Sequence, residues 1–94
     1  MIEISITSKG VQMQGHAGKG VKGHDIVCAA ISALTCNVIN SLAHLTDNHI
    51  RADTSSGKTV IEWETLSAQG QLLVDSWFLG IAAINREYNC ITFV

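Results

Sequence analysis

Alternating hydrophobic and polar residues at the start of the chain predict a β-hairpin. Its apolar positions are Ile2, Ile4, Ile6, Val11 and Met13. A turn at residues 8–10 separates the two strands. Successive side chains in a strand point to opposite faces of the sheet. The hairpin should therefore have one apolar face. His16 follows the second strand in phase with the polar positions, so we expect its side chain to be accessible to solvent.

A second pattern, with apolar residues at helical spacing, predicts a long core helix. Its apolar positions are Ile31, Leu34, Val38, Leu42 and Leu45. Asp25 comes before this run and is a suitable N-cap, because its carboxylate can accept a hydrogen bond from a free backbone N–H of the first turn. We expect the helix to end near Thr46.

The second half of the chain predicts another hairpin, another helix and a short last strand. The expected strands are 50–54, 61–63 and 91–93. Residues 55–58 form the turn of the hairpin, and Ser67 can cap a helix whose apolar stripe runs to Tyr88. The order ββαββαβ predicts an α+β fold, with two helices packed on a mixed or antiparallel sheet. We expect one small domain over residues 1–94.

Composition narrows the classes of function. A net charge of −2 with scattered Lys and Arg disfavours direct binding to nucleic acid. We find no apolar run near the roughly 18 residues of a spanning helix and no signal peptide, so we expect no membrane partner. The 3 cysteines lack a CxxC spacing, which is typical of reduced thiols in a cytoplasmic protein.

Cys28 is the residue with the clearest chemical potential. With Asp25 as the N-cap it is the third helical residue, where free N–H groups and the helix dipole favour a thiolate. A nearby protonated His16 would add to this effect, and such surroundings lower the pKa of a thiol from about 8.5 to roughly 3.5–7.5. The alternative is a small core residue, and from type and position alone both readings stay open. We expect Cys36 and Cys90 to be core residues.

Neighbouring residues can support this pair. Ser32 lies one turn beyond Cys28, where its hydroxyl can reach the same site or bond back to the carbonyl of Cys28. Asp25 can act as a helix cap and also orient the imidazole. Three glycines stand between His16 and the helix, in a segment with few apolar anchors that we expect to be mobile. They are Gly18, Gly20 and Gly23.

Nucleotide and metal binding are weaker interpretations of the same segment. Residues 18–23 fit G-x-G-x-x-G, but the preceding strand belongs to a hairpin and Asp25 places negative charge where a pyrophosphate would lie. His16, His24 and Cys28 could ligate zinc, yet their spacing matches no known pattern. We therefore expect neither a metal nor a cofactor.

The segment from Gly15 through Cys28 to Thr35, in which the cysteine stands twelve positions after the histidine, resembles the ribosomal-processing cysteine proteases of the Prp family. Similarity continues at 72–73, 80–82 and 87–88, over nearly the whole chain. The resemblance implies a homodimeric, cytoplasmic endopeptidase of bacteria or phages. It would remove an N-terminal extension from a large-subunit ribosomal protein, or from a phage protein with a similar extension.

The resemblance also implies roles for individual residues. Cys28 would be the nucleophile and His16 the general base, with Asp25 and Ser32 as supporting positions. The loop with Gly18, Gly20 and Gly23 would open and close over the peptide. The alternative function is a non-catalytic dimeric module that binds a ribosomal or phage partner protein.

Overall fold

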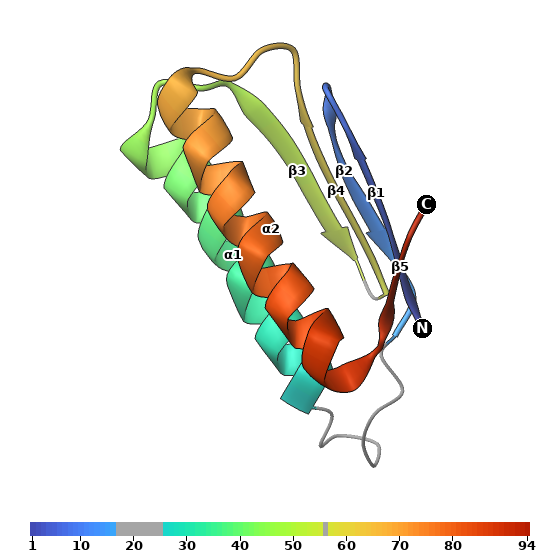
Figure 1. Cartoon of the computed structure of the whole chain (residues 1–94). Helices are drawn as coiled ribbons and strands as arrows, with labels where there is room; N and C mark the ends of the chain where they lie inside the picture. Colours follow the sequence, from blue (N-terminus) through green and yellow to red (C-terminus); the bar gives the residue numbers. More distant parts are fainter. Residues whose placement is uncertain (17–25, 56) are drawn as a thin grey trace.

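The computed structural model describes residues 1–16, 26–55 and 57–94. Its elements are β1 (Ile2–Thr7), β2 (Gly10–Gln14), α1 (Ile26–Leu45), β3 (Ile50–Ser55), β4 (Lys58–Trp63), α2 (Ala68–Tyr88) and β5 (Ile91–Phe93). Figure 1 shows two layers, with both helices lying along one face of the sheet. The predicted order ββαββαβ is confirmed.

The sheet is mixed, and its strand order places the two hairpins side by side. The order is β3-β4-β2-β1-β5, with every pair antiparallel except β1 and β5. The pairing of β2 with β4 sets Gln14 opposite Lys58, so the end of the first hairpin meets the turn of the second. This contact between distant segments places the candidate site.

The core lies between the sheet and the helices. It contains Ile2, Ile4, Val11, Met13, Val27, Ile31, Val38, Leu42, Ile61, Trp63, Val74, Trp77, Ile81, Cys90 and Ile91. Four of the five apolar positions predicted for the first hairpin are buried, but Ile6 is 40% exposed. Strand β5 pairs with β1 only as far as Ile4, so Ile6 has no partner residue in β5.

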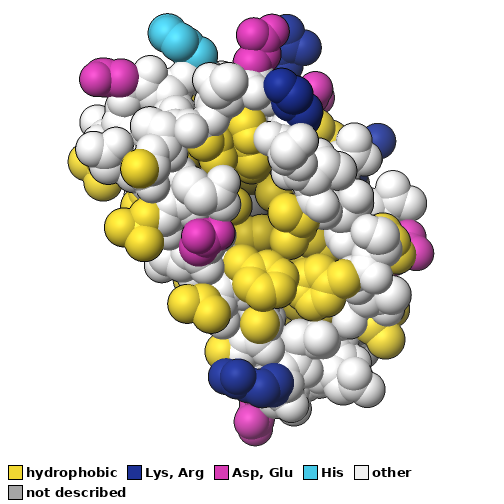
Figure 2. Space-filling view, turned by 45° about the horizontal axis from the view of Figure 1, so that its top comes forward, with side chains coloured by type: hydrophobic (Ala, Val, Ile, Leu, Met, Phe, Trp, Pro, Cys, Tyr) yellow, Lys and Arg dark blue, Asp and Glu magenta, His cyan; other side chains and the backbone are white. Residues whose placement is uncertain are grey.

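Two partly exposed aromatic side chains lie between α2 and β5. Phe78 of α2 and Phe93 of β5 contact each other there, with ring centroids 5.5 Å apart. Both rings stay partly exposed, as Ile6 does. Figure 2 shows hydrophobic side chains gathered in the middle of one face, with most of the charged side chains toward its ends.

Helix α1 carries its buried residues on one stripe and contains no Asp, Glu, Lys or Arg. Its buried residues are Val27, Ile31, Thr35, Val38 and Leu42. The expectation that no apolar run reaches the length of a membrane span was wrong, because this 20-residue helix has a mean hydropathy of 1.8 over its best window. The core helix of a globular protein can be equally long and apolar, so these two properties do not identify a membrane span. The buried residues of α1 belong to the core of this fold.

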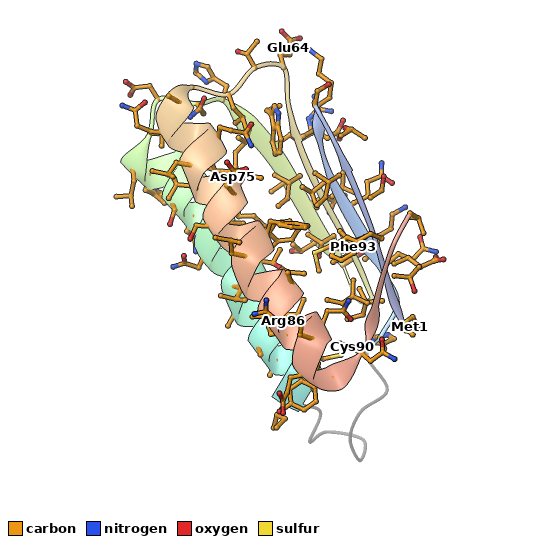
Figure 3. The ribbon with its side chains drawn as sticks, viewed as in Figure 1. Met1, Glu64, Asp75, Arg86, Cys90 and Phe93 are labelled. Atoms are coloured by element: carbon orange, nitrogen blue, oxygen red, sulfur yellow. The ribbon has the colours of Figure 1, made fainter. Side chains whose placement is uncertain are left out.

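Helix α2 begins and ends with recognisable caps. The Ser67 hydroxyl accepts a hydrogen bond from the Gly70 N–H at 3.1 Å, which confirms the predicted N-cap. At the other end Asn89 adopts a left-handed conformation with φ of 48°. The Asn85 side chain then accepts from the backbone N–H groups of Cys90 and Ile91, which fixes the path from α2 into β5. Figure 3 shows Cys90 at this junction.

Candidate active site

His16 is held just beyond the end of β2 by backbone contacts. The Gly15 N–H donates to the carbonyl of Gly57 at 2.8 Å, and the backbone nitrogen of Met1 donates to the carbonyl of His16 at 2.8 Å. Gly15 has a φ of 106°, and a Cβ atom there would lie 2.6 Å from the Met1 carbonyl oxygen. Only glycine fits this position without a shift of the backbone. The His16 side chain is exposed, as predicted.

The turn between β3 and β4 lies directly against the His16 ring. Gly57 has a φ of 75°, and a Cβ atom there would lie 3.1 Å from Nε2 of His16. Glycine is thus favoured twice at this position, once for its backbone conformation and once for the space that it leaves to the imidazole. The turn fixes one side of the ring.

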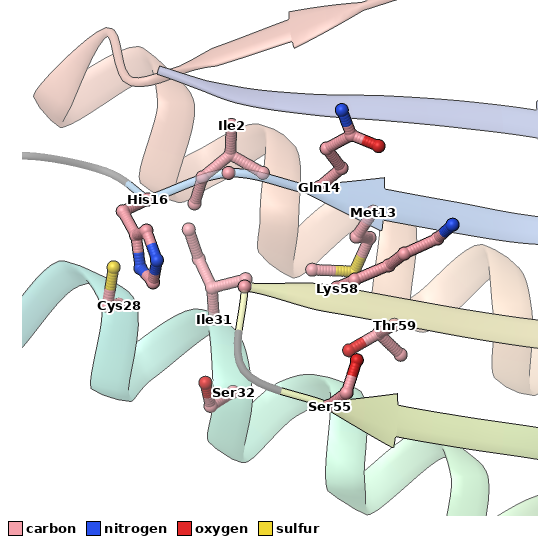
Figure 4. A pocket seen from close by; sticks show the side chains of 12 residues that line it. Ile2, Met13, Gln14, His16, Cys28, Ile31, Ser32, Ser55, Lys58 and Thr59 are labelled. Carbon is pink, nitrogen blue, oxygen red and sulfur yellow. The ribbon is translucent and has the colours of Figure 1, made fainter.

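Cys28 faces His16 from the first turns of α1. It is the third residue of the helix, as predicted, and its side chain is half-buried. Figure 4 shows the Cys28 sulfur and the His16 ring turned toward each other in one pocket. The two residues come from different layers of the fold and are brought together by the packing of α1 on the sheet.

The pocket around this pair has a volume of about 150 Å³. Its apolar part is formed by Ile2, Met13 and Ile31, all members of the core. Polar side chains on the other side are Ser32, Ser55, Lys58 and Thr59. A pocket with an apolar floor and a few polar groups around a candidate nucleophile fits a substrate-binding site.

Of the predicted supporting residues, the structure places Ser32 in the pocket, with an exposed side chain. Asp25 and the loop glycines Gly18, Gly20 and Gly23 lie outside the described residues, as does His24. Sequence reasoning missed Ser55, Gly57, Lys58 and Thr59 as pocket residues. The sequence marks residues 55–58 as a turn, but only the order of strands in the sheet brings that turn to His16.

The three cysteines differ in their surroundings. Cys90 is fully buried, which confirms its assignment to the core. Cys36 is exposed, so the same expectation was wrong for it. Cys36 lies on the side of α1 away from the buried stripe, because its position is about half a helical turn away from Val27 and Val38. Within residues 1–16, 26–55 and 57–94, no group of three or more His, Cys, Asp or Glu could hold a metal ion.

A thiol beside an imidazole at a helix N-terminus can act as a nucleophile toward carbonyl groups. The imidazole can take up the thiol proton, and the positive end of the α1 dipole favours both a thiolate and a developing oxyanion. This arrangement supports acyl-transfer chemistry.

Comparison with known proteins agrees with this chemistry. Residues 1–91 match the family model of the cysteine protease Prp. The chain belongs to this family. A ribosomal processing cysteine protease Prp of Staphylococcus aureus strain Mu50 is 33% identical over 95 aligned residues, which cover 94% of this chain and 90% of the relative. The protein is therefore a cysteine protease, and the resemblance found in the sequence is confirmed.

Two solved structures of the Prp protease from S. aureus share the fold. One is a complex with a covalently linked product peptide, with a TM-score of 0.86 and 29% identity over 98% of this chain and 94% of that one. The other holds a substrate peptide, with a TM-score of 0.81 and 28% identity over 99% and 95%. Both confirm the α+β architecture of five strands and two helices.

Proposed function

We propose that the protein is an endopeptidase that uses Cys28 as nucleophile and His16 as general base to remove an N-terminal extension from a large-subunit ribosomal protein. The observation that carries this proposal is the meeting of Cys28 and His16 in one pocket at the start of α1. The pocket lies in a chain of the Prp family, whose S. aureus relative is named as a ribosomal processing protease.

The reaction follows from the placement of these groups. His16 takes the thiol proton, and the Cys28 sulfur attacks the scissile carbonyl to give a tetrahedral oxyanion. The N-terminal end of α1 stabilises this negative charge. The C–N bond then breaks, and the leaving amine takes the proton from His16. Water attacks the resulting thioester, releases the new carboxyl group and restores the thiol.

The apolar floor of the pocket supports binding of an uncharged peptide segment. Ile2, Met13 and Ile31 can accept an apolar side chain next to the scissile bond, while Ser55, Lys58 and Thr59 offer polar contacts to its backbone. The covalently linked product peptide of the S. aureus structure supports a covalent intermediate in this chain as well.

The substrate is tested by mapping new protein N-termini. A lysate of bacterial proteins is treated with the unmodified chain or with the Cys28→Ala variant, and N-termini are labelled and identified by mass spectrometry. We expect a new N-terminus in a large-subunit ribosomal protein with the unmodified chain alone. The exposed Cys36 lies outside the pocket, so Cys36→Ala serves as the matched control and should cleave like the unmodified chain.

Two other results would contradict the proposal. If the Cys28→Ala variant produced the same new N-termini, the cut would not depend on this thiol. If the unmodified chain bound the ribosomal protein without cutting it, the protein would be a binding module, the alternative that the sequence left open.

We further propose that two copies associate through the helical layer and that the enzyme works in the cytoplasm, where ribosomes are assembled. The outward face of α1 carries Ala29, Ala33, Cys36 and Asn40, and α2 exposes Leu72 and Leu79 to 69% and 70%. Exposed apolar side chains of this kind favour an interface. Sedimentation should show a dimer, and Leu79→Glu should shift it toward the monomer; a monomeric unmodified chain would contradict the proposal.

A further inference from the structure

Strand β3 ends the sheet and keeps one backbone edge open. Among the strands that the structure describes, β3 pairs with β4 alone. The register runs without interruption from Ile50 opposite Trp63 to Ser55 opposite Lys58, so no bulge disturbs this edge. The chain contains no proline to block it. Proteins protect edge strands with bulges, prolines, charged side chains or a covering element. Strand β3 carries the charged Arg51 and Asp53, but its backbone edge stays open for pairing.

The hairpin geometry identifies the free backbone groups of β3. Ser55 and Lys58 flank a turn of two residues, and the pair that closes such a turn is hydrogen-bonded. Hydrogen-bonded and non-bonded pairs alternate along antiparallel strands, so Asp53 and Arg51 also bond to β4. Ala52 and Thr54 therefore direct their N–H and C=O groups away from β4.

The side chains of these two residues leave room beside the edge. Ala52 lies opposite the buried Ile61, so its side chain points to the helical side of the sheet, as that of Thr54 does. Both residues are nevertheless exposed. The helical layer leaves this part of β3 uncovered, although both residues alternate in phase with Ile50.

The open edge leads into the candidate active site. Ser55, the last residue of β3, lines the pocket together with Ser32, Cys28 and His16. Figure 4 shows the end of β3 at Ser55 close to the α1 residues of the pocket. A segment that lies along β3 and continues past Ser55 therefore enters the pocket that holds the thiol.

We propose that the substrate binds as an extended peptide that adds a strand to the open edge of β3, with backbone hydrogen bonds to Ala52 and Thr54 on one side of the scissile bond. The proposal rests on the protease function proposed above. Addition of a strand to a sheet edge is a general mode of peptide recognition, in which the backbone supplies affinity and alternate side chains supply specificity. A bound substrate peptide then explains both why the edge of β3 is open and why it leads into the pocket.

The test removes one backbone donor at the edge. Proline at position 52 lacks the outward N–H but leaves the β3–β4 hydrogen bonds in place, and edge positions tolerate proline. The matched control is Ile6→Pro, because the amide of Ile6 points away from β2 at the opposite border of the sheet. The probe is the substrate peptide of the S. aureus Prp protease, and its cleavage is followed by mass spectrometry.

We expect Ala52→Pro to lower kcat/KM about fivefold, the effect of one backbone hydrogen bond, and Ile6→Pro to leave it within about twofold of the unmodified chain. The rate of Cys28 alkylation by iodoacetamide should stay unchanged in Ala52→Pro, which shows that the pocket is intact. N-methylation of successive peptide bonds in the substrate should impair cleavage at every second position, as a strand requires.

The possible failures are distinguishable. Equal cleavage by Ala52→Pro and the unmodified chain, or no alternation in the N-methyl series, would overturn the strand addition and leave the protease function standing. Absence of cleavage by the unmodified chain would count against the proposed function, and strand addition of a substrate would fall with it. If Ala52→Pro changed the sedimentation of the protein instead, a second copy and not the peptide would occupy the edge.

Discussion

The imidazole of His16 lies against the backbone of Gly57, so close that a Cβ atom at Gly57 would be 3.1 Å from Nε2. The two residues are 41 positions apart in the sequence, since 57 minus 16 is 41. The pairing of β2 with β4 joins them, and the hydrogen bond from the Gly15 N–H to the Gly57 carbonyl fixes their distance. The turn between β3 and β4 thus positions the ring of the proposed general base.

We predict that Gly57→Ala lowers kcat of peptide cleavage about tenfold while KM changes little. The new methyl group displaces the imidazole by a few tenths of an ångström, and small errors in the placement of a catalytic group reduce the rate strongly. Activity is measured with the S. aureus substrate peptide at several concentrations, so that kcat and KM are separated.

The φ of 75° at Gly57 calls for a control, because alanine also strains the backbone there. Gly57→Asn serves this purpose, since asparagine tolerates a left-handed conformation but still has a Cβ atom. We expect Gly57→Asn to unfold at a higher temperature than Gly57→Ala and yet to remain slow. Recovery of full activity in Gly57→Asn would show that strain, and not contact with His16, caused the loss.

A second prediction concerns the relative reactivity of two cysteines on the same helix. Cys36 is exposed and Cys28 is half-buried, so accessibility alone would make Cys36 the faster to react. We predict the reverse order, because the helix N-terminus and His16 favour the thiolate of Cys28. Iodoacetamide at neutral pH followed by peptide mapping measures both rates in one sample.

His16→Ala then shows where the reactivity comes from. We expect alkylation of Cys28 to slow by at least about tenfold in this variant, while the rate at Cys36 remains the same. Equal rates at the two cysteines in the unmodified chain would mean that Cys28 is an ordinary thiol, and the proposed mechanism would lose its nucleophile.

The sequence predicted the elements well because each carries a clear periodic pattern. In the first hairpin, buried apolar residues alternate with polar ones, and this pattern can be read from the local sequence. The buried residues are Ile2, Ile4, Val11 and Met13. The capping residue Ser67 was found in the same way. The resemblance to the Prp family predicted that His16 and Cys28 act together, and the structure places both in one pocket.

Features that depend on how the helices and strands are arranged in space could not be predicted from the sequence. Gly57 and Lys58 enter the pocket because β4 lies next to β2, and no local pattern encodes the order of strands. Ala52 alternates like a core residue, yet it is exposed where β3 forms the border of the sheet. Cys36 was assigned to the core by residue type, whereas its angular position on α1 turns it outward.

A third prediction concerns Ser32, which lines the pocket one turn after Cys28. Its side chain is exposed, so Ser32→Ala should leave the unfolding temperature unchanged. We expect kcat/KM to fall about threefold to tenfold, the effect of one hydrogen bond to the substrate or to the site. Ser76→Ala, an exposed serine on α2 outside the pocket, is the matched control and should have no effect on cleavage. Activity of Ser32→Ala equal to that of the control would remove Ser32 from the site.

The last prediction addresses the contact that fixes α1 against α2 under the pocket. Thr35 is the one buried polar residue of the core, among the residues that the structure describes. Its hydroxyl donates to the Ile31 carbonyl at 2.7 Å and accepts from Nε1 of Trp77 at 3.1 Å. Thr35→Val keeps the shape of the side chain but leaves the buried indole N–H without this acceptor.

We expect Thr35→Val to lower the free energy of unfolding by about 1–3 kcal/mol, the cost of a buried donor left unpaired. Urea denaturation measures this change. In Trp77→Phe the donor is absent, so replacing Thr35 by Val in that background should cost less than in the unmodified chain. Equal costs in both backgrounds would show that the hydrogen bond between the two helices contributes nothing to stability, and that the loss reflects the other contacts of the hydroxyl, with the Ile31 carbonyl and Met13 Sδ.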